Sequence, residues 1–213
     1  MSNYSLSTSA LRKNFGRRLI FENLNFSFNT AGVYGISGPN GSGKSTLVKM
    51  IAGLLSPTSG EINHKANDRT IIPEELHKYI GFASPYLILY EEFSAQENLN
   101  LVANIRKINP DWKFIDELLS HFLLIDRKND LVKSYSSGMK QRLKFVFALL
   151  HNPRLLILDE PTSNLDDAGK EIVYKLIEEI SNNSIVIVAS NEKSDLEICR
   201  EIILLEKFKP KII

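Results

Sequence analysis

The stretch GPNGSGKST, residues 38–46, constrains the fold of this 213-residue chain more than any other feature. It matches the pattern G-x-x-x-x-G-K-[ST] and lies between an apolar run, GVYGIS, and a run with helical spacing, KSTLVKMIAGLL. Glycines let the backbone curl so that successive N–H groups point inward, and the N-terminus of the following helix adds a favourable dipole. This order predicts a strand, a phosphate-binding loop and a helix.

A second apolar run, RLLILDE, predicts a buried strand that ends in two carboxylates, Asp159 and Glu160. Acidic residues often end strands, but together with a phosphate-binding loop they are expected at a nucleoside-triphosphate site. Lys44 would then reach the β and γ phosphates, while Ser45 and Asp159 would hold Mg²⁺. Glu160 would polarise the attacking water.

The third apolar run, SIVIVASNE, is β-branched over residues 185–189 and stops abruptly at Ser190 and Asn191. Such a run is typical of a strand that is buried on both faces. Open α/β sheets place their ligands at the carboxyl ends of parallel strands, so Asn191 is a further candidate for the site.

The rest of the chain predicts an α/β fold with a mostly parallel sheet. Residues 5–36 read as strands of a partly antiparallel N-terminal β layer. Helical patterns dominate from about residue 85 to 151, and strands alternate with helices after that. We therefore expect one domain, in which residues 1–84 and 152–213 form the nucleotide-binding core and residues 85–151 form an inserted α-helical subdomain.

The segment SYSSGMKQRL, residues 134–143, predicts a helix that opens on small residues and carries Lys140, Gln141 and Arg142 in its first turn. Cations at a helix N-terminus are disfavoured by a few tenths of a kcal/mol each, roughly. A nearby anion would reverse that cost. The alternative is a Ser-capped helix whose basic side chains are solvated.

In their order and spacing, these motifs resemble those of the nucleotide-binding subunits of ABC transporters, over essentially the whole chain. YSSGM stands where the family has its signature, and LLILDEPTSNLD resembles the Walker B strand and D-loop. The resemblance implies a RecA-like P-loop fold, the ATPase reaction, and ATP with Mg²⁺. It also implies two chains that close around two ATP, either a homodimer or a heterodimer.

The resemblance implies three groups of site residues. The catalytic group is Glu160, Lys44 and Asn191. Serine 45 and Asp159 would bind the metal. The nucleotide would contact Phe15, Gly38, Pro39, Asn40, Gly41, Ser42, Gly43, Lys44, Ser45, Thr46, Ser136, Gly138 and Asp166. Of these, Ser136 and Gly138 would contact the γ-phosphate held by the opposing chain, with Asp166 at the interface, and Phe15 would stack on adenine. Without the resemblance, Phe15 reads equally well as a packed strand aromatic.

Three departures from the family pattern stand out, the mildest being Ser137 and Met139 in the signature, where the family has a glycine and a glutamine. Asn191 stands where the family has a histidine, and an asparagine can donate a hydrogen bond but cannot carry a proton or a positive charge. Pro85, or Ser84 beside it, stands where the family has a glutamine. These changes leave open an alternative function, a regulatory nucleotide-binding subunit with weak or no hydrolysis.

Composition bears on the partners. The formal net charge is +1 without a basic block, so no nucleic-acid partner is expected. No run approaches the about 20 apolar residues that span a bilayer. We therefore expect a cytoplasmic protein that binds the cytoplasmic face of the membrane through a separate transmembrane permease. The YSSGM form resembles exporter-type members. The permease would dock near residues 86–101, which could instead form the core of the insertion.

Overall fold

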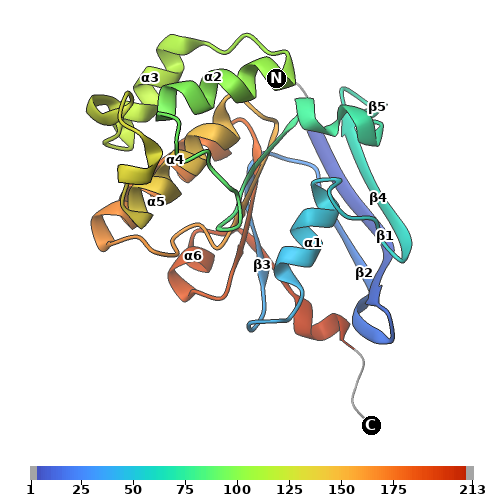
Figure 1. Ribbon diagram of the computed structural model, residues 1–213. Helices are drawn as coiled ribbons and strands as arrows, with labels where there is room; N and C mark the ends of the chain where they lie inside the picture. Colours follow the sequence, from blue (N-terminus) through green and yellow to red (C-terminus); the bar gives the residue numbers. More distant parts are fainter. Residues whose placement is uncertain (1–3, 210–213) are drawn as a thin grey trace.

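The computed structural model describes residues 4–209 and contains a five-stranded and a four-stranded sheet. Figure 1 shows the larger sheet at the centre of the molecule. Its strands run in the order β6 (Ile80–Ala83), β7 (Leu155–Asp159), β8 (Ile185–Ser190), β3 (Gly32–Ser37) and β9 (Glu201–Leu204). All neighbouring strands in it pair in parallel. The predicted α/β fold with a mostly parallel sheet is confirmed.

Both faces of this sheet are buried, as the continuous apolar runs predicted. In β7, Leu155 and Ile157 belong to one hydrophobic cluster, whereas Leu156 and Leu158 belong to another. Strand β8 divides in the same way. Because side chains alternate across a strand, an uninterrupted apolar run supplies both clusters at once.

The four-stranded sheet is antiparallel and has the order β2 (Arg18–Phe28), β1 (Tyr4–Phe15), β4 (Ser59–Ala66) and β5 (Arg69–Thr70). Helix α1 (Lys44–Ile51) lies between this sheet and the parallel one (Figure 1). The sequence predicted β1 and β2 but not β4. Only His64 is fully buried in β4, so the strand lacks the apolar alternation by which a strand is recognised.

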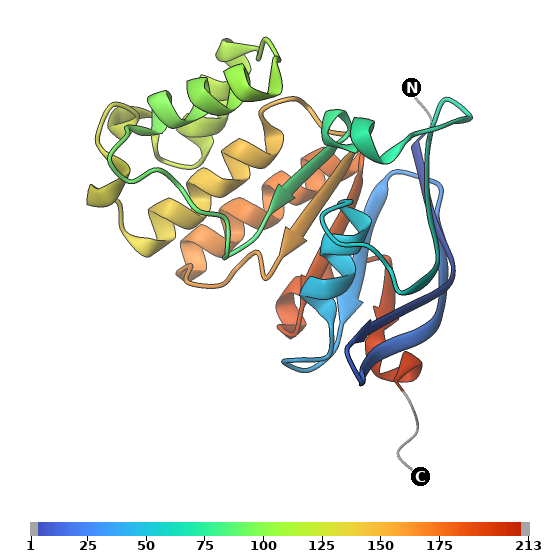
Figure 2. The ribbon, with the colours of Figure 1, turned by 45° about the vertical axis from the view of Figure 1, so that its right-hand side comes forward.

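Helices α4 (Ser137–Leu149) and α5 (Asp167–Ser181) pack on the other face of the parallel sheet, and α2 (Ala95–Arg106) and α3 (Trp112–His121) pack in turn against α4 (Figure 2). All four belong to one hydrophobic cluster. Each begins at a side chain that accepts a backbone N–H, namely Ser94, Asp111, Ser136 and Asp166. Such caps satisfy N–H groups that have no partner within the helix. A short helix, α6 (Lys193–Glu197), joins β8 to β9.

Helix α4 packs on β6 at a glycine that leaves no room for a side chain. A Cβ built on Gly81 would lie 2.1 Å from the carbonyl oxygen of Ala148 and 2.9 Å from Pro153. We expect Gly81→Ala to lower the free energy of unfolding by about 1–3 kcal/mol, the usual cost of overpacking. Urea unfolding measures this change.

Gly16→Ala is the control, because a Cβ there meets no atom within 4 Å and only the left-handed backbone, with φ of 55°, is penalised. We expect that variant to lose no more than about 1–2 kcal/mol. A Gly81→Ala protein as stable as the wild type would contradict the close packing of α4 on β6.

The parallel strands all end at one edge of the sheet, where the motifs gather. Ser37 of β3 pairs with Ser190 of β8, and Asp159 of β7 pairs with Ala189. The phosphate-binding loop, Glu160 and Asn191 each follow directly after one of these strand ends. The fold thus brings together three segments that lie far apart in the sequence.

Candidate functional site

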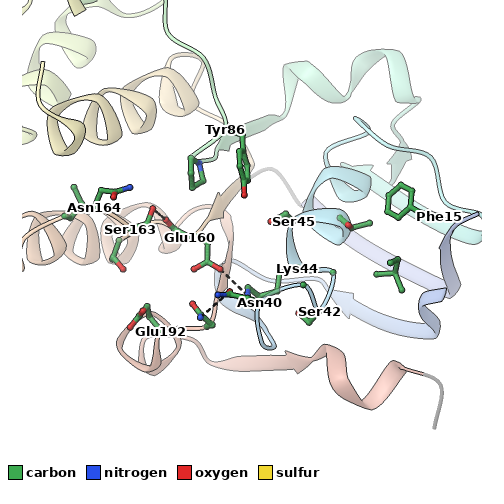
Figure 3. A pocket seen from close by; sticks show the side chains of 18 of the residues that line it. Phe15, Asn40, Ser42, Lys44, Ser45, Tyr86, Glu160, Ser163, Asn164 and Glu192 are labelled. Atoms are coloured by element: carbon green, nitrogen blue, oxygen red, sulfur yellow. Dashed lines mark hydrogen bonds and ion pairs between the residues drawn. The ribbon is translucent and has the colours of Figure 1, made fainter. Parts of the chain in front are cut away.

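The loops at this edge line a cleft with a volume of about 920 Å³. Figure 3 shows it with Lys44 and Glu160 facing each other. Most of its lining comes from the phosphate-binding loop, from the segment after β7 and from the ends of β6 and β8. The lining residues are Phe15, Arg18, Ile20, Asn40, Gly41, Ser42, Gly43, Lys44, Ser45, Thr46, Pro85, Tyr86, Glu160, Thr162, Ser163, Asn164, Leu165, Lys170, Asn191 and Glu192.

The phosphate-binding loop has the curled backbone that its glycines predicted. Gly41 and Gly43 have φ of 75° and 108°, and a Cβ on Gly43 would lie 2.5 Å from Ile20. Side chains other than glycine rarely adopt such angles. Ser42 is buried, and its hydroxyl is without a hydrogen-bond partner in residues 4–209. A buried polar group of this kind suits a polar ligand in the cleft.

Lys44, at the start of α1, extends back toward the loop. Its ammonium donates to the carbonyl of Gly38 at 2.9 Å and lies 3.1 Å from the Glu160 carboxylate. The lysine is 5% exposed, so its charge is held in a region from which water is largely excluded. Because such a region strengthens electrostatic attraction, Lys44 is well placed to bind an anion such as a phosphate.

Ser45 and Asp159 meet, as the sequence predicted. The Ser45 hydroxyl donates to the Asp159 carboxylate at 3.1 Å, and the Ser84 hydroxyl approaches the other oxygen at 3.4 Å. Burial raises the pKa of Asp159, and the two hydroxyls oppose that shift. A bound divalent cation would stabilise the ionised carboxylate, so these oxygen donors fit Mg²⁺.

Within residues 4–209, no cluster of three or more His, Cys, Asp or Glu side chains is arranged to hold a metal ion. The pair of Ser45 and Asp159 nevertheless suits Mg²⁺. This ion commonly takes one or two protein ligands and completes its shell with water and substrate phosphates.

Glu160 adopts a backbone conformation that is uncommon for its type, with φ of 49°. Two hydrogen bonds hold it: its N–H donates to the carbonyl of Ala189 at 2.8 Å, and its carbonyl accepts from the Ser163 hydroxyl at 2.9 Å. Left-handed backbone at a non-glycine residue persists only where the surroundings fix it, and it is concentrated at functional sites. Here it places the carboxylate beside Lys44.

Asn191 lies at the far side of the loop. Its amide donates to the side-chain oxygen of Asn40 at 3.4 Å, so it faces the phosphate-binding loop from the end of β8. Pro85, one of the two residues expected at the glutamine position, lines the cleft, and the other, Ser84, approaches Asp159. The carbonyl of Pro85 accepts a hydrogen bond of 2.6 Å from the buried ammonium of Lys144 on α4.

Phe15 lies at the other end of the cleft, beyond the loop (Figure 3). Its ring is 49% exposed, and the ammonium of Lys13 lies 4.9 Å from the ring centroid. A half-exposed aromatic that lines a cleft offers a face for stacking. The stacking of Phe15 on adenine stays a prediction.

Ser136, Gly138 and Asp166 lie outside the lining of this cleft. Ser136 is exposed and caps α4, and Asp166 is exposed and caps α5. A Cβ on Gly138 would lie 3.4 Å from the carbonyl of Asn164, so the start of α4 adjoins the segment that follows Glu160.

The polar side chains that follow Ser136 are occupied within the chain. Lys140 pairs with Glu91 at 2.6 Å, the Gln141 amide approaches the carbonyl of Pro161 at 3.4 Å, and Arg142 donates to the carbonyl of Phe122 at 3.0 Å. Glu91 is therefore one anion that neutralises a cation in the first turn of α4.

Sequence reasoning missed some residues of this region. Tyr86 and Lys170 line the cleft, and Asp195 is buried and accepts a hydrogen bond from Ser190. None belongs to a recognisable motif. The only signal for Asp195 was its position four residues after Asn191.

Comparison with known proteins supplies a further finding. The family profile described as ABC transporter matches residues 21–163. The ABC transporter ATP-binding protein YhcH of Bacillus subtilis is 36% identical over 96% of this chain and 68% of its own length. The lantibiotic transport ATP-binding protein SrtF of Streptococcus pyogenes is 36% identical over 87% of this chain and 79% of its own length.

A solved ABC transporter ATP-binding protein from Pyrococcus furiosus has the same fold. Its TM-score is 0.83 at 25% identity, and the match covers 97% of this chain and all of that protein.

Proposed function

Because this chain belongs to the ABC transporter family of ATP-binding proteins, which are ATPases, we propose that it is the energy-coupling subunit of an exporter. In this proposal it binds ATP with Mg²⁺, pairs with a second nucleotide-binding subunit around two ATP, and drives a separate membrane subunit. The convergence of Lys44, Ser45, Glu160 and Asn191 on one cleft, with Asp159 hydrogen-bonded to Ser45, carries the proposal.

The geometry supports a division of labour in hydrolysis. Lys44 and the backbone N–H groups of residues 41–46 bind and orient the phosphates, and Lys44 exchanges its contact with Glu160 for the phosphate oxygens. Glu160 takes the proton of the attacking water. The Asn191 amide donates to a γ-phosphate oxygen. Ser45 and Asp159 would hold Mg²⁺, which neutralises charge that develops on the phosphates.

The second subunit is supported by the position of the signature. Ser136 is exposed at the start of α4 and lies outside its own chain's cleft, so it is free to face a nucleotide bound elsewhere. The N-terminus of a helix attracts anions. A second copy, or a related chain, that presents its own signature would complete the cleft. We assign Ser136, Gly138 and Asp166 to that shared interface.

The membrane partner is supported by an apolar strip beside the cleft. Tyr86, Ile88, Tyr90 and Phe93 are exposed, whereas Leu89 between them is buried. The segment thus serves both alternatives considered from the sequence, since part of it enters the core and part faces outward. None of the helices in residues 4–209 has the length and apolar composition of a membrane span. Relatives such as SrtF are named for transport.

A regulatory subunit with little hydrolysis is the second candidate function. It is favoured by Asn191, which cannot carry charge, and by Pro85, which has no side-chain donor. The intact pair of Lys44 and Glu160 favours hydrolysis instead.

Steady-state release of phosphate from ATP and Mg²⁺ by the purified chain separates the two. We expect the wild type to turn over and Asn191→His to raise the rate by about tenfold, because a hydrogen bond from a charged donor is stronger by about 1–1.5 kcal/mol. Asn191→Ala is the control, and its rate of phosphate release is expected to be lower than that of the wild type because alanine has no hydrogen-bond donor. If the wild type and Asn191→His both bind nucleotide but neither releases phosphate, hydrolysis is removed from the proposal.

A further inference from the structure

Asp195 is a fully buried carboxylate that the proposed reaction does not use. It lies in α6 and is 0% exposed. Three hydroxyls converge on it: Thr162 at 2.9 Å and Tyr174 at 2.8 Å on one oxygen, and Ser190 at 2.7 Å on the other. Burying a carboxylate costs several kcal/mol, roughly, unless hydrogen bonds replace the lost water. Three donors on one buried group indicate a built arrangement.

The donors come from three separate elements. Thr162 lies two residues after Glu160, Ser190 directly precedes Asn191, and Tyr174 belongs to α5. Two of the three are therefore neighbours of the two side chains that face the γ-phosphate in the proposed function. Burial raises the pKa of Tyr174, so its phenol remains a proton donor at neutral pH.

Ser190 links Asp195 to the end of β8 and lies next to Glu160. Its hydroxyl oxygen lies 2.7 Å from Asp195 and 3.3 Å from a carboxylate oxygen of Glu160, and it accepts the N–H of Glu192 at 3.0 Å. A hydroxyl has one proton, which the shorter contact assigns to Asp195, so Ser190 holds the end of β8, whereas the Glu160 segment is held through Thr162. The residues on both sides of Asn191 are thereby fixed by a single hydroxyl.

The segment after β7 is held from the same point. Thr162 binds Asp195, and the left-handed backbone of Glu160 lies between this anchor and the Ala189 carbonyl that accepts its N–H. Loss of the anchor would free both the strained residue and the end of β8.

We propose that Asp195 is a positioning residue for ATP hydrolysis, which through Ser190 and Thr162 fixes Glu160 and Asn191 against the γ-phosphate. This inference rests on the proposed function. Asp195 is 0% exposed and does not line the cleft, so it acts on the geometry of the two facing groups and leaves nucleotide binding to the phosphate-binding loop.

The test is Asp195→Asn in the full chain, assayed by phosphate release and by the dissociation constant for ATP and Mg²⁺. Asparagine keeps the shape but turns one acceptor oxygen into an amide donor, so one hydroxyl loses its acceptor. We expect kcat to fall by about 10–100-fold, as for comparable supporting contacts. KM and the dissociation constant should stay within about twofold of the wild type.

Tyr174→Phe is the matched control, because it removes a donor to the same carboxylate from the side of α5, away from Glu160. We expect its kcat to stay within about twofold of the wild type. Equal losses in Asp195→Asn and Tyr174→Phe would overturn the proposal, since they would indicate a purely structural carboxylate. An unchanged kcat in Asp195→Asn would overturn it as well.

Ser190 supplies a second test that depends less on folding. Ser190→Ala should lose kcat without losing ATP affinity, and Ser190→Thr, which restores the hydroxyl, should recover it. Failure of threonine to recover the rate would overturn the role of the hydroxyl. The wild type and Glu160→Gln are run in parallel. A wild type that binds ATP but releases no phosphate removes the proposed function, whereas an active wild type with an unaffected Asp195→Asn removes only the anchor.

Discussion

Glu160→Gln is expected to lower the rate of phosphate release by at least about 100-fold, because an amide cannot take a proton from the attacking water. Glutamine keeps the size of the side chain and can still approach the Lys44 ammonium, which lies 3.1 Å from the carboxylate. The loss should therefore fall on kcat, while ATP still binds. Comparison of kcat with the dissociation constant for ATP measures both effects.

Glu179→Gln carries the same replacement on the exposed face of α5 and should behave as the wild type. If Glu160→Gln kept more than a tenth or so of the wild-type rate, Glu160 would not be the general base. If it instead lost nucleotide binding, the ion pair with Lys44 would be needed to shape the loop, and the assignment of roles would have to change.

Two inactive variants of this chain are expected to restore each other when mixed. Lys44→Ala removes the phosphate-binding cation, and Ser136→Glu places a negative charge where a partner's γ-phosphate is proposed to bind. Each alone should release phosphate at less than about one hundredth of the wild-type rate. In a mixed dimer, the P-loop of one variant meets the signature of the other, and one of the two sites is then intact.

When Lys44→Ala and Ser136→Glu chains are mixed in equal amounts and exchange partners, half of the dimers contain one chain of each. Each mixed dimer has one working site of two, so the mixture should recover about a quarter of the wild-type rate. Lys113→Ala mixed with Ser136→Glu serves as a control for charge removal, because Lys113 lies on the exposed surface of α3. A Lys44→Ala and Ser136→Glu mixture that is as inactive as its components would contradict a composite site between two copies of this chain. Full activity of Ser136→Glu alone would remove Ser136 from the site.

Local patterns in the sequence predicted those parts of the fold in which a single physical requirement determines the residue types, such as burial on both faces or an unusual backbone angle. The runs that became β7 and β8 are apolar throughout because both faces are buried. The P-loop was predicted because its glycines have no substitute at such backbone angles. Strand β4 was missed because it is held mainly by backbone pairing with β1, which leaves little trace in side-chain type.

The site divides in the same way. Lys44 and Ser45 were predicted from the phosphate-binding motif, and Asp159, Glu160 and Asn191 from strand ends. The fold places these residues together. Asp195 was not, because a charged residue in a short polar helix ordinarily faces water. Its burial depends on hydroxyls from three elements, a relation that no local pattern expresses. The division of the chain at residues 85 and 151 stays a prediction, as do the contacts made by Ser136.

The hydrogen bond from Lys144 to Pro85 joins helix α4 to the wall of the cleft. Pro85 lies in the wall of the cleft, and Lys144 lies on the helix that begins at the Ser136 cap. Eight residues of α-helix separate Ser136 from Lys144, a rigid length of about 12 Å. Because Pro85 is hydrogen-bonded to this rigid helix, we expect the two to move together. A displacement of Pro85 is therefore expected to move the N-terminus of α4, which in the proposed dimer adjoins the nucleotide of the opposing chain.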